Sequence, residues 1–482
     1  MKRTAKIIVT PITHIVNLTL KTGIFPEALK KAKVIPILKS GNRSEIKNYR
    51  PISILPAFSK IFEKVINYRL ISFFENNNLL IDNQHGFRSG RSTETAILQF
   101  ATNVFQSLEE KQYLIGVFLD LSKAFDTLRH RILLKKLSHY GVRGIPLKLF
   151  ESYLTNRSQS VYCNFTHSSF RSIVNGVPQG SILGPTLFLI YINDIVNVSS
   201  KFKYIIYADD TTLLMDDLNI NNLHFNLIQE LEKINNWTKI NNLSLNTTKT
   251  NYIFFQNRSV HHNFPPVTIE GNTVDRVQFT KFLGVFLDEN MNWNKHIAFV
   301  VNKLSRMCGI LYRVRNNLTF ESLISIYYTL CYPHLTYCVA IWACTWQSFI
   351  KKVTIAQNKI FRCMFYMNRY QSTRNIFNTV NFLTFANIHK YFLYLSIFKY
   401  LTQYSGAQPF RLVHTPYNTR GNDVNLICPQ FRTTLFKHSI LCAGPLIWND
   451  LPTNIKTLFH NVNVTTFKKY VKTYLYHTQN LL

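Results

Sequence analysis

Acidic residues are scarce in this 482-residue chain. It contains 25 Asp and Glu against 55 Lys and Arg, which gives a formal net charge of +30 at pH 7. A positive field of this size favours a polyanionic partner, either nucleic acid or an anionic membrane surface, over a merely solvated basic surface. Hydrophobic residues make up 46% of the chain and aromatic residues 14%, which excludes a disordered polymer and allows more than one folded domain.

Closely spaced cysteine pairs and a secretory leader are also lacking. None of the eight cysteines has CxxC spacing, which argues against a zinc finger. Residues 1–6 are basic, but no clean apolar segment follows them before Pro11. We therefore expect a protein of the nucleus or cytoplasm that is not secreted and that keeps its thiols reduced.

Residues 323–346 form a run without any Asp, Glu, Lys or Arg. A membrane span needs about 20 apolar residues, but this run contains Pro333, His334 and several hydroxyl side chains. We interpret it as a buried helix on which Cys331, His334 and Cys338 share one face of a core, and we expect no membrane association. A structural membrane-associated protein built around this run stays open as an alternative.

Hydrophobic periodicity divides the rest of the chain into short elements. Helices are predicted at residues 5–22, 58–70, 93–105 (with Ser92 as N-cap), 186–195 and 227–237. Strands are predicted at residues 33–38, 114–121, 204–208, 211–215, 252–255 and 279–287, with a hairpin formed by 161–165 and 170–174. Residues 292–400 look mainly helical. No internal repeat and no long linker is visible.

Two of the apolar strands end in carboxylates. Asp120 closes the first, and Asp209 and Asp210 lie at the tip of a predicted hairpin. Desolvating an acid is costly unless a cation or a donor compensates it, so in so basic a chain the grouping suggests a bound cation. Oxygen ligands suit Mg²⁺, with Mn²⁺ as a substitute, and two such ions about 4 Å apart activate a 3′-hydroxyl and stabilise a leaving pyrophosphate. The alternative is that these residues cap turns or pair with lysines.

Residues 207–210, Tyr-Ala-Asp-Asp, match the signature of reverse transcriptases. Further motifs of that family follow the same order along the chain, at residues 48–53, 84–93, 118–126, 176–185, 249–250 and 282–285. Together, over residues 25–287, the chain resembles the reverse transcriptases of non-long-terminal-repeat retrotransposons of the jockey and chicken-repeat type. A softer likeness to the C-terminal tail of such elements covers residues 431–452.

The resemblance implies an α+β right-hand polymerase. We expect fingers at residues 1–112, a palm at 113–290 with an antiparallel sheet and helices on one face, a helical thumb at 291–405, and a basic C-terminal region at 406–482. The activity implied is RNA-directed DNA polymerisation from dNTPs, with an RNA template and a DNA primer or target DNA as partners. Because the chain begins almost at the fingers, we expect no upstream endonuclease. An inactive truncated relic that only binds nucleic acid is the alternative.

The resemblance also assigns roles to single residues. Asp120 and Asp209 would be the main metal ligands, Asp210 a weaker one, and Lys249 a general acid for the pyrophosphate. Residues 282–285 would grip the primer end or simply pack the palm. The remaining substrate-binding candidates are Lys39 and Arg50 for the triphosphate, Arg88 for the template or triphosphate, Phe125 beneath the sugar, and Gln179 and Gly180 along the incoming base and template. The alternatives for these are a solvated basic loop, core packing for Phe125 and an ordinary turn for Gln179 and Gly180.

Overall fold

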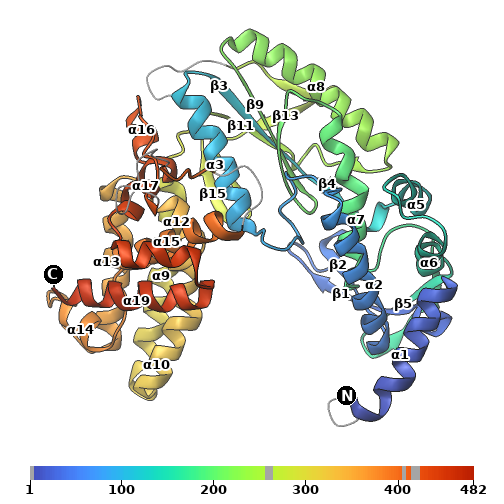
Figure 1. Ribbon diagram of the computed structural model, residues 1–482, viewed down its shortest axis with the longest axis horizontal. Helices are drawn as coiled ribbons and strands as arrows, with labels where there is room; N and C mark the ends of the chain where they lie inside the picture. Colours follow the sequence, from blue (N-terminus) through green and yellow to red (C-terminus); the bar gives the residue numbers. More distant parts are fainter. Residues whose placement is uncertain (1–4, 256–263, 404–408, 414–423, 482) are drawn as a thin grey trace.

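The computed structural model describes residues 5–255, 264–403, 409–413 and 424–481. Figure 1 shows an arch in which a central sheet joins two lobes. The blue and green lobe carries the N-terminal helices and a second sheet, and the yellow to red lobe is helical. The α+β class expected from the sequence is confirmed.

The central sheet has six strands in the order β12-β13-β11-β3-β9-β8. Their bounds are Val267–Ile269, Asn272–Arg276, Asn251–Phe255, Tyr113–Leu119, Asp210–Asp217 and Lys203–Tyr207. β3 pairs antiparallel with β9 and β11, and β8 with β9, whereas β11 and β13 run parallel. The sheet is therefore antiparallel, as expected, apart from the short parallel pairing of β11 with β13; the strands β12 and β13 were not predicted.

Helices cover both faces of this sheet, which corrects the expectation of one covered face. Alternate residues of β3 belong to different cores: Leu114 packs in the cluster that contains helix α3 (Thr93–Glu109), and Ile115 in the cluster of α7 (Leu183–Ile192) and α8 (Ile220–Ile240). The apolar run at 114–121 fits this arrangement, since a strand buried on both sides has no polar alternation. Ser92 is the N-cap of α3, as predicted, and its side chain accepts from the backbone N–H of Thr95.

The N-terminal lobe is built around a second sheet. β1 (Lys31–Leu38) pairs antiparallel with β2 (Tyr49–Ile54) and parallel with β5 (Arg157–Cys163). The predicted hairpin of 161–165 with 170–174 is present with a different pairing. The start of β5, at residues 157–159, pairs with β7 (Arg171–Ile173), and the end of β5 pairs with the short β6 (Thr166–His167), which was not predicted. The helices of this lobe are α1 (Ala5–Thr22), α2 (Ala57–Asn76), α5 (His130–His139) and α6 (Ile145–Leu154).

The predicted strand at 279–287 is instead a hairpin. β14 (Phe279–Phe282) pairs antiparallel with β15 (Val285–Asp288), and the chain reverses at Leu283 and Gly284. Both turn residues have positive φ, 45° and 89°. The turn was not predicted because the apolar pattern continues through it and Gly284 is its only turn-forming residue.

The run at 323–346, which lacks Asp, Glu, Lys and Arg, is not one helix. It is divided into α10 (Phe320–Ile326), a π-helix (Tyr327–Cys331), α11 (Tyr332–Thr336) and α12 (Val339–Trp342). Cys338 has φ 52°, which ends the helical path before α12. Cys331 and Cys338 are both buried, but they do not share the single helix face that was expected with His334. No described helix is long and apolar enough to cross a membrane.

Residues 292–403 are mainly helical, as predicted, with α9 (Asn294–Val314), α13 (Gln347–Met364), α14 (Arg374–Thr379) and α15 (Phe385–Gln403) as further members. The last segment adds α16 (Thr434–Lys437), α17 (Ile440–Asn449), α18 (Thr453–Lys456) and α19 (Val464–Leu481). α15, α17 and α19 share one hydrophobic cluster and lie together in Figure 1. The expected boundary between residues 405 and 406 lies outside the described residues.

Candidate active site

A tight turn between β8 and β9 carries two adjacent carboxylates. Tyr207 pairs with Asp210, so Ala208 and Asp209 alone form the connection. Ala208 has φ 58°, the left-handed geometry that two-residue hairpin turns require. Asp209 is half-buried and Asp210 is exposed.

Residues 83–86 hold this turn from the side. They run beside β8, where the N–H of His85 donates to the carbonyl of Ile206 at 2.7 Å and the N–H of Ile206 donates to that of Asn83 at 2.9 Å. The Oε1 of Gln84 accepts from the N–H of Ala208 at 3.1 Å and from that of Gly86 at 2.8 Å. The matched motif at 84–93 therefore supports the acidic turn directly.

Asp120 reaches the same place from the neighbouring strand. β3 and β9 pair through Leu119 and Thr211, so the residues that flank this pair lie side by side. The N–H of Asp120 donates to the hydroxyl of Thr250 at 3.3 Å, and its carbonyl accepts from the N–H of Asn246 at 2.8 Å. These bonds bring Lys249 close, with its Nζ 3.9 Å from Oδ2 of Asp120.

The electrostatics of the turn show how close these groups are. Burial raises the pKa of Asp209, and the carboxylate of Asp120 raises it further, against the opposing effects of Arg50 and Lys39. Asp210 reaches the surface, but the surrounding protein still desolvates its carboxyl in part; this desolvation, followed by the charges of Asp209 and Asp120, raises the pKa of Asp210 to about 6, and Lys39 again opposes. These carboxylates repel one another in a partly desolvated place, and a bound cation would relieve that repulsion.

The acids can supply only part of a metal's ligands. Among the residues that the structure describes, no three His, Cys, Asp or Glu side chains converge into a metal site of their own. The carboxylates of Asp120 and Asp209 are nevertheless hard oxygen donors beside one another. Mg²⁺ typically takes one or two carboxylates and completes its shell with waters and phosphate oxygens, so this donor set fits such an ion.

Two cations face the acids from the N-terminal lobe. Lys39 follows β1, and Arg50 lies in β2 opposite Ile37. Both side chains are exposed, and both act on the titration of Asp209. The pair therefore flanks the acidic turn with positive charge, on the side from which a polyphosphate could be held.

The loop at 176–185 closes another side of the site. The N–H of Ser53 donates to the carbonyl of Gln179 at 2.7 Å. Gly180 has φ 128°, and a Cβ there would lie 2.5 Å from the carbonyl oxygen of Ser53, so glycine is required. The Nε2 of Gln179 donates to Oδ1 of Asp126 at 2.8 Å, and burial raises the pKa of Asp126.

Phe125 lies in a short helix after Asp120 and is half-buried. Its ring centroid is 4.6 Å from that of Phe188 in α7. The contact holds the ring in place, and it is compatible both with core packing and with a wall of the site.

Arg88 is not brought to the acids by any contact of the structure. Its Nε and Nη2 bind the carboxylate of Glu75 at 2.9 and 2.6 Å, and its Nη1 donates to the carbonyl of Ile81 at 2.7 Å. These bonds occupy the guanidinium and tie the 84–93 loop to α2. The expected contact of Arg88 with the template or the triphosphate stays a prediction.

Two supporting residues were missed in the sequence. Glu63 of α2 is fully buried and accepts from the hydroxyl of Ser59 at 3.0 Å and from the N–H of Ile182 at 2.6 Å. His85 binds Thr95 and Gln99 through its two ring nitrogens, and burial lowers its pKa to about 4. An acid inside an amphipathic helix gives no signal of burial, whereas His85 stood within a matched motif.

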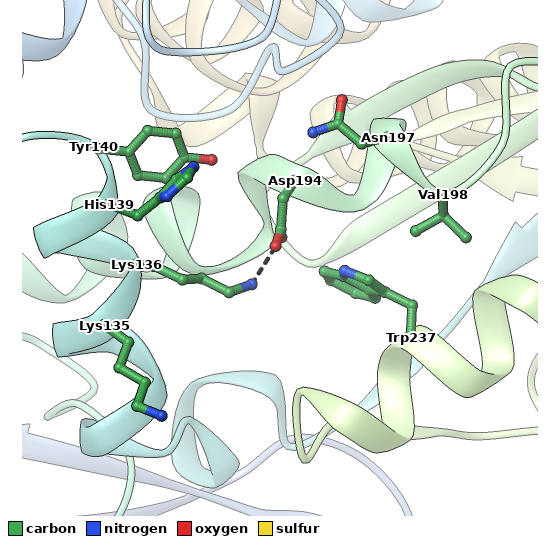
Figure 2. Close-up of a pocket in the computed structure, with 8 residues that line it drawn as sticks. All are labelled: Lys135, Lys136, His139, Tyr140, Asp194, Asn197, Val198 and Trp237. Carbon is green, nitrogen blue, oxygen red and sulfur yellow. Dashed lines mark hydrogen bonds and ion pairs between the residues drawn. The ribbon is translucent and has the colours of Figure 1, made fainter.

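A cavity of about 670 Å³ lies between α5, α8 and the 3₁₀ helix Asn193–Asn197, and Figure 2 shows its lining. Lys136 points across it to Asp194, with Nζ and Oδ1 2.7 Å apart, and also lies over the ring of Trp237. Burial lowers the pKa of Lys136, and Asp194 opposes that effect. None of the predicted site residues lines this cavity, so it is separate from the acidic turn. The charges of Lys136 and Asp194 at its centre neutralise each other.

Comparisons with known proteins agree with the motifs. The family described as "Reverse transcriptase (RNA-dependent DNA polymerase)" matches residues 37–287. The chain is 31% identical over 377 residues to the "RNA-directed DNA polymerase from mobile element jockey" of Drosophila melanogaster, which covers 75% of this chain and 40% of that protein. It is 29% identical over 362 residues to the "Probable RNA-directed DNA polymerase from transposon X-element" of the same fly, covering 73% and 39%. The chain thus spans about two fifths of these relatives' length.

Solved structures of low similarity were also found. The apo telomerase from Candida tropicalis aligns with a TM-score of 0.43 at 11% identity, covering 83% of this chain and 72% of that chain. The telomerase from Candida albicans, solved with a fragment of telomeric RNA, aligns with a TM-score of 0.40 at 14% identity, covering 74% and 66%.

Proposed function

The chain belongs to the reverse transcriptase (RNA-dependent DNA polymerase) family, and on that premise we propose that it copies RNA into DNA for a non-long-terminal-repeat retrotransposon. The observation that carries the proposal is the acidic turn at Asp209 and Asp210, beside Asp120 and opposed by Lys39 and Arg50. This arrangement suits the transfer of a nucleotide from a triphosphate to a primer end. The partners are an RNA template, a DNA primer or target DNA, and dNTPs, and the place of action is the nucleus or cytoplasm.

We assign the fingers to residues 1–112, the palm to 113–290, the thumb to 291–405 and a basic C-terminal region to 406–482. The central sheet and the acidic turn fall in the palm, and the β1–β2 hairpin with its two cations falls in the fingers. Between Glu321 and Asp423 the sequence contains no acidic residue, which suits a thumb that follows the phosphates of a duplex.

Asp120, Asp209 and, more weakly, Asp210 would hold two Mg²⁺ ions, with Mn²⁺ as a substitute. When bound, such ions lower the pKa of the primer hydroxyl and neutralise the charge that develops on the leaving pyrophosphate. In the reaction, the 3′-hydroxyl oxygen bonds to the α-phosphorus of the dNTP as the bond to pyrophosphate breaks. Lys249 lies beside Asp120 and would give a proton to the pyrophosphate.

The remaining residues would bind and orient the substrate. Lys39 and Arg50 would neutralise the triphosphate, and Gln179 and Gly180 would line the incoming base and the template. Phe125, held against Phe188, would exclude a 2′-hydroxyl and so select deoxynucleotides. The hydrogen bond from Gln179 to Asp126 supports the proposal by fixing that loop next to the short helix of Phe125.

Primer extension tests the proposal. With poly(rA)/oligo(dT), Mg²⁺ and dTTP, the wild-type chain should extend the primer and Asp209→Asn should not. Asp217→Asn is the matched control. Asp217 lies on the same hairpin, but its Oδ1 accepts from the N–H of Asn219 at 2.8 Å. A folded wild-type chain that binds the duplex without extending it would favour the inactive nucleic-acid-binding relic. Equal extension by Asp209→Asn would refute the assignment of the site.

A further inference from the structure

Tyr337 lies in the run at 323–346, at the break between α11 and α12. Its N–H donates to the carbonyl of Pro333 at 3.1 Å, and its own carbonyl accepts from Nε1 of the buried Trp342 at 2.8 Å. The next residue, Cys338, has left-handed backbone geometry, with φ 52°. The backbone of Tyr337 is therefore fixed by the helical lobe, and its side chain leaves that lobe at a defined place.

The phenol of Tyr337 crosses from the helical lobe to the β14–β15 turn. Its hydroxyl donates to the carbonyl oxygen of Leu283 at 2.5 Å. A Cβ added to Gly284 would lie 3.1 Å from Cε1 of the ring and 3.3 Å from Oη. The ring thus lies against one turn residue while the hydroxyl holds the other. Figure 1 shows α12 and β15 next to each other where the lobe meets the sheet.

The turn is one that needs such support. A two-residue turn with positive φ at both positions favours Asn-Gly, but here the first position is Leu283, a bulky residue in a strained geometry. Phe282, just before it, is anchored by the rings of Phe100 and Phe118, with centroids 5.6 and 5.8 Å away. One end of the turn is therefore held by the sheet core and its tip by Tyr337.

Two further residues act on the titration of the Tyr337 phenol. Thr93, at the start of α3, lowers its pKa, and Tyr207, which precedes the acidic turn, raises it. Tyr337 is 40% exposed, but partial desolvation of its phenol raises the pKa to about 12, so the phenol stays a neutral donor at physiological pH. Tyr337 thus contacts the Leu283–Gly284 turn directly.

We propose that Tyr337 is a positioning residue that holds the Leu283–Gly284 turn in place, and thereby places the primer 3′ end before the acids. This inference rests on the proposed polymerase function, and it takes the first of the two roles that the resemblance leaves open for residues 282–285, that of gripping the primer end. It gives the thumb a direct influence on the chemical step, because a shift of the helical lobe moves the carbonyl of Leu283. Misplacement of a reacting group by about 1 Å costs as much as a hundredfold in rate.

The test compares Tyr337→Phe, which keeps the ring and loses the donor, with the wild type. Tyr328→Phe is the matched control, since Tyr328 belongs to the same run and stacks on Phe382 at 5.3 Å. Two readouts are used: the maximal single-turnover rate of the first dNTP addition, and the fluorescence of a 2-aminopurine at the primer 3′ end in the bound RNA–DNA duplex. The second readout needs no catalysis.

Tyr337→Phe should lower the maximal rate about tenfold and change the fluorescence, while the duplex dissociation constant and the melting temperature stay close to wild type. Tyr328→Phe should change neither readout. Unchanged rate and fluorescence in Tyr337→Phe would overturn the inference, and so would a loss explained wholly by weaker duplex binding or a lower melting temperature. If the wild type itself fails to extend, the proposed function fails, and the fluorescence still decides whether Tyr337 sets the primer end.

Discussion

The side-chain oxygen of Gln84 accepts a hydrogen bond from the backbone N–H of Ala208, at 3.1 Å, and so fixes the turn that carries Asp209. The same oxygen accepts from Gly86 at 2.8 Å. The turn itself depends on a left-handed alanine, which is an uncommon geometry for a residue with a side chain. Its shape therefore depends on a residue more than a hundred positions earlier in the chain.

Replacement of Gln84 by Met should release this turn. The N–H groups of Ala208 and Gly86 would lose their acceptor, at a cost of about 1–3 kcal/mol in folding free energy. We expect the single-turnover rate of dNTP addition to fall by about tenfold or more, because the acids would no longer be fixed. Gln357→Met is the matched control: Gln357 is also buried and binds Tyr327 and Leu383 in the helical lobe. If both variants lose stability but keep the rate, Gln84 has no role in the turn.

Replacement of Gly86 by Ala should displace the same turn by a steric route. The added Cβ would lie 2.5 Å from the backbone nitrogen of Ala208, closer than any real contact. We expect at least a tenfold loss of rate. Gly309→Ala in α9 is the control, since a Cβ there meets no atom within 4 Å, and it should raise stability by roughly 0.5–1 kcal/mol. Equal activity of the two alanine variants would contradict the close approach of Gly86 to the turn.

Much of the central sheet could be predicted because its strands are continuous apolar runs in the sequence. The run at 114–121 is interrupted by one acid, and the run at 204–215 by two adjacent acids and two threonines, so both the strands and the turn between β8 and β9 could be predicted. Ser92 was recognised as a helix start because a small polar residue stands directly before a periodic apolar stretch. These features are local, and the structure confirms them.

What could not be predicted depends on tertiary contacts. The turn at Leu283 lies within an apolar run, and nothing in a leucine signals positive φ. The break at Cys338 has no local signature either, and Pro333 falls in the first turn of α11, where proline is tolerated. The partners of Arg88 and the burial of Glu63 come from residues distant in sequence, so neither was predicted.

The buried histidines predict sensitivity to acid. Burial lowers the pKa of His85 and of His296 to about 4, from an unfolded value near 6.5. The unfolded chain therefore binds more protons than the folded one between pH 6.5 and 4, so stability falls as the pH falls through this range. Each histidine should cost on the order of 2–3 kcal/mol by pH 4.

Urea unfolding at pH 7 and pH 5 measures this effect. His85→Gln should reduce the loss of stability between the two pH values, because the group that gains a proton on unfolding is gone. His14→Gln is the control, since His14 is exposed on α1. A pH dependence that is the same in His85→Gln and in the wild type would exclude His85 as a source of the acid sensitivity.

Arg432 joins the C-terminal region to α3, the helix that packs on one face of the central sheet. Its guanidinium donates to the carbonyls of Leu108 and Glu109, at 3.1 and 2.8 Å, where α3 ends with unsatisfied acceptors. In return, the carboxylate of Glu109 accepts from the N–H of Thr433 at 3.1 Å and from its hydroxyl at 2.5 Å, at the start of α16. Two helix ends thus cap each other across more than three hundred residues of sequence.

Replacement of Arg432 by Ala should therefore weaken the docking of α16 without unfolding the sheet. Loss of these bonds costs about 1–2 kcal/mol, and the cost is local because α16 is short and the sheet core is untouched. Hydrogen exchange should become faster in α16 and the last turn of α3, and remain unchanged in β3 and β9. Lys437→Ala is the charge-matched control, since Lys437 is exposed on α16 and lies over the ring of Phe431. Faster exchange throughout the sheet would mean that the C-terminal region is part of the palm's own folding unit, whereas unchanged exchange in α16 would mean that its apolar contacts alone hold it.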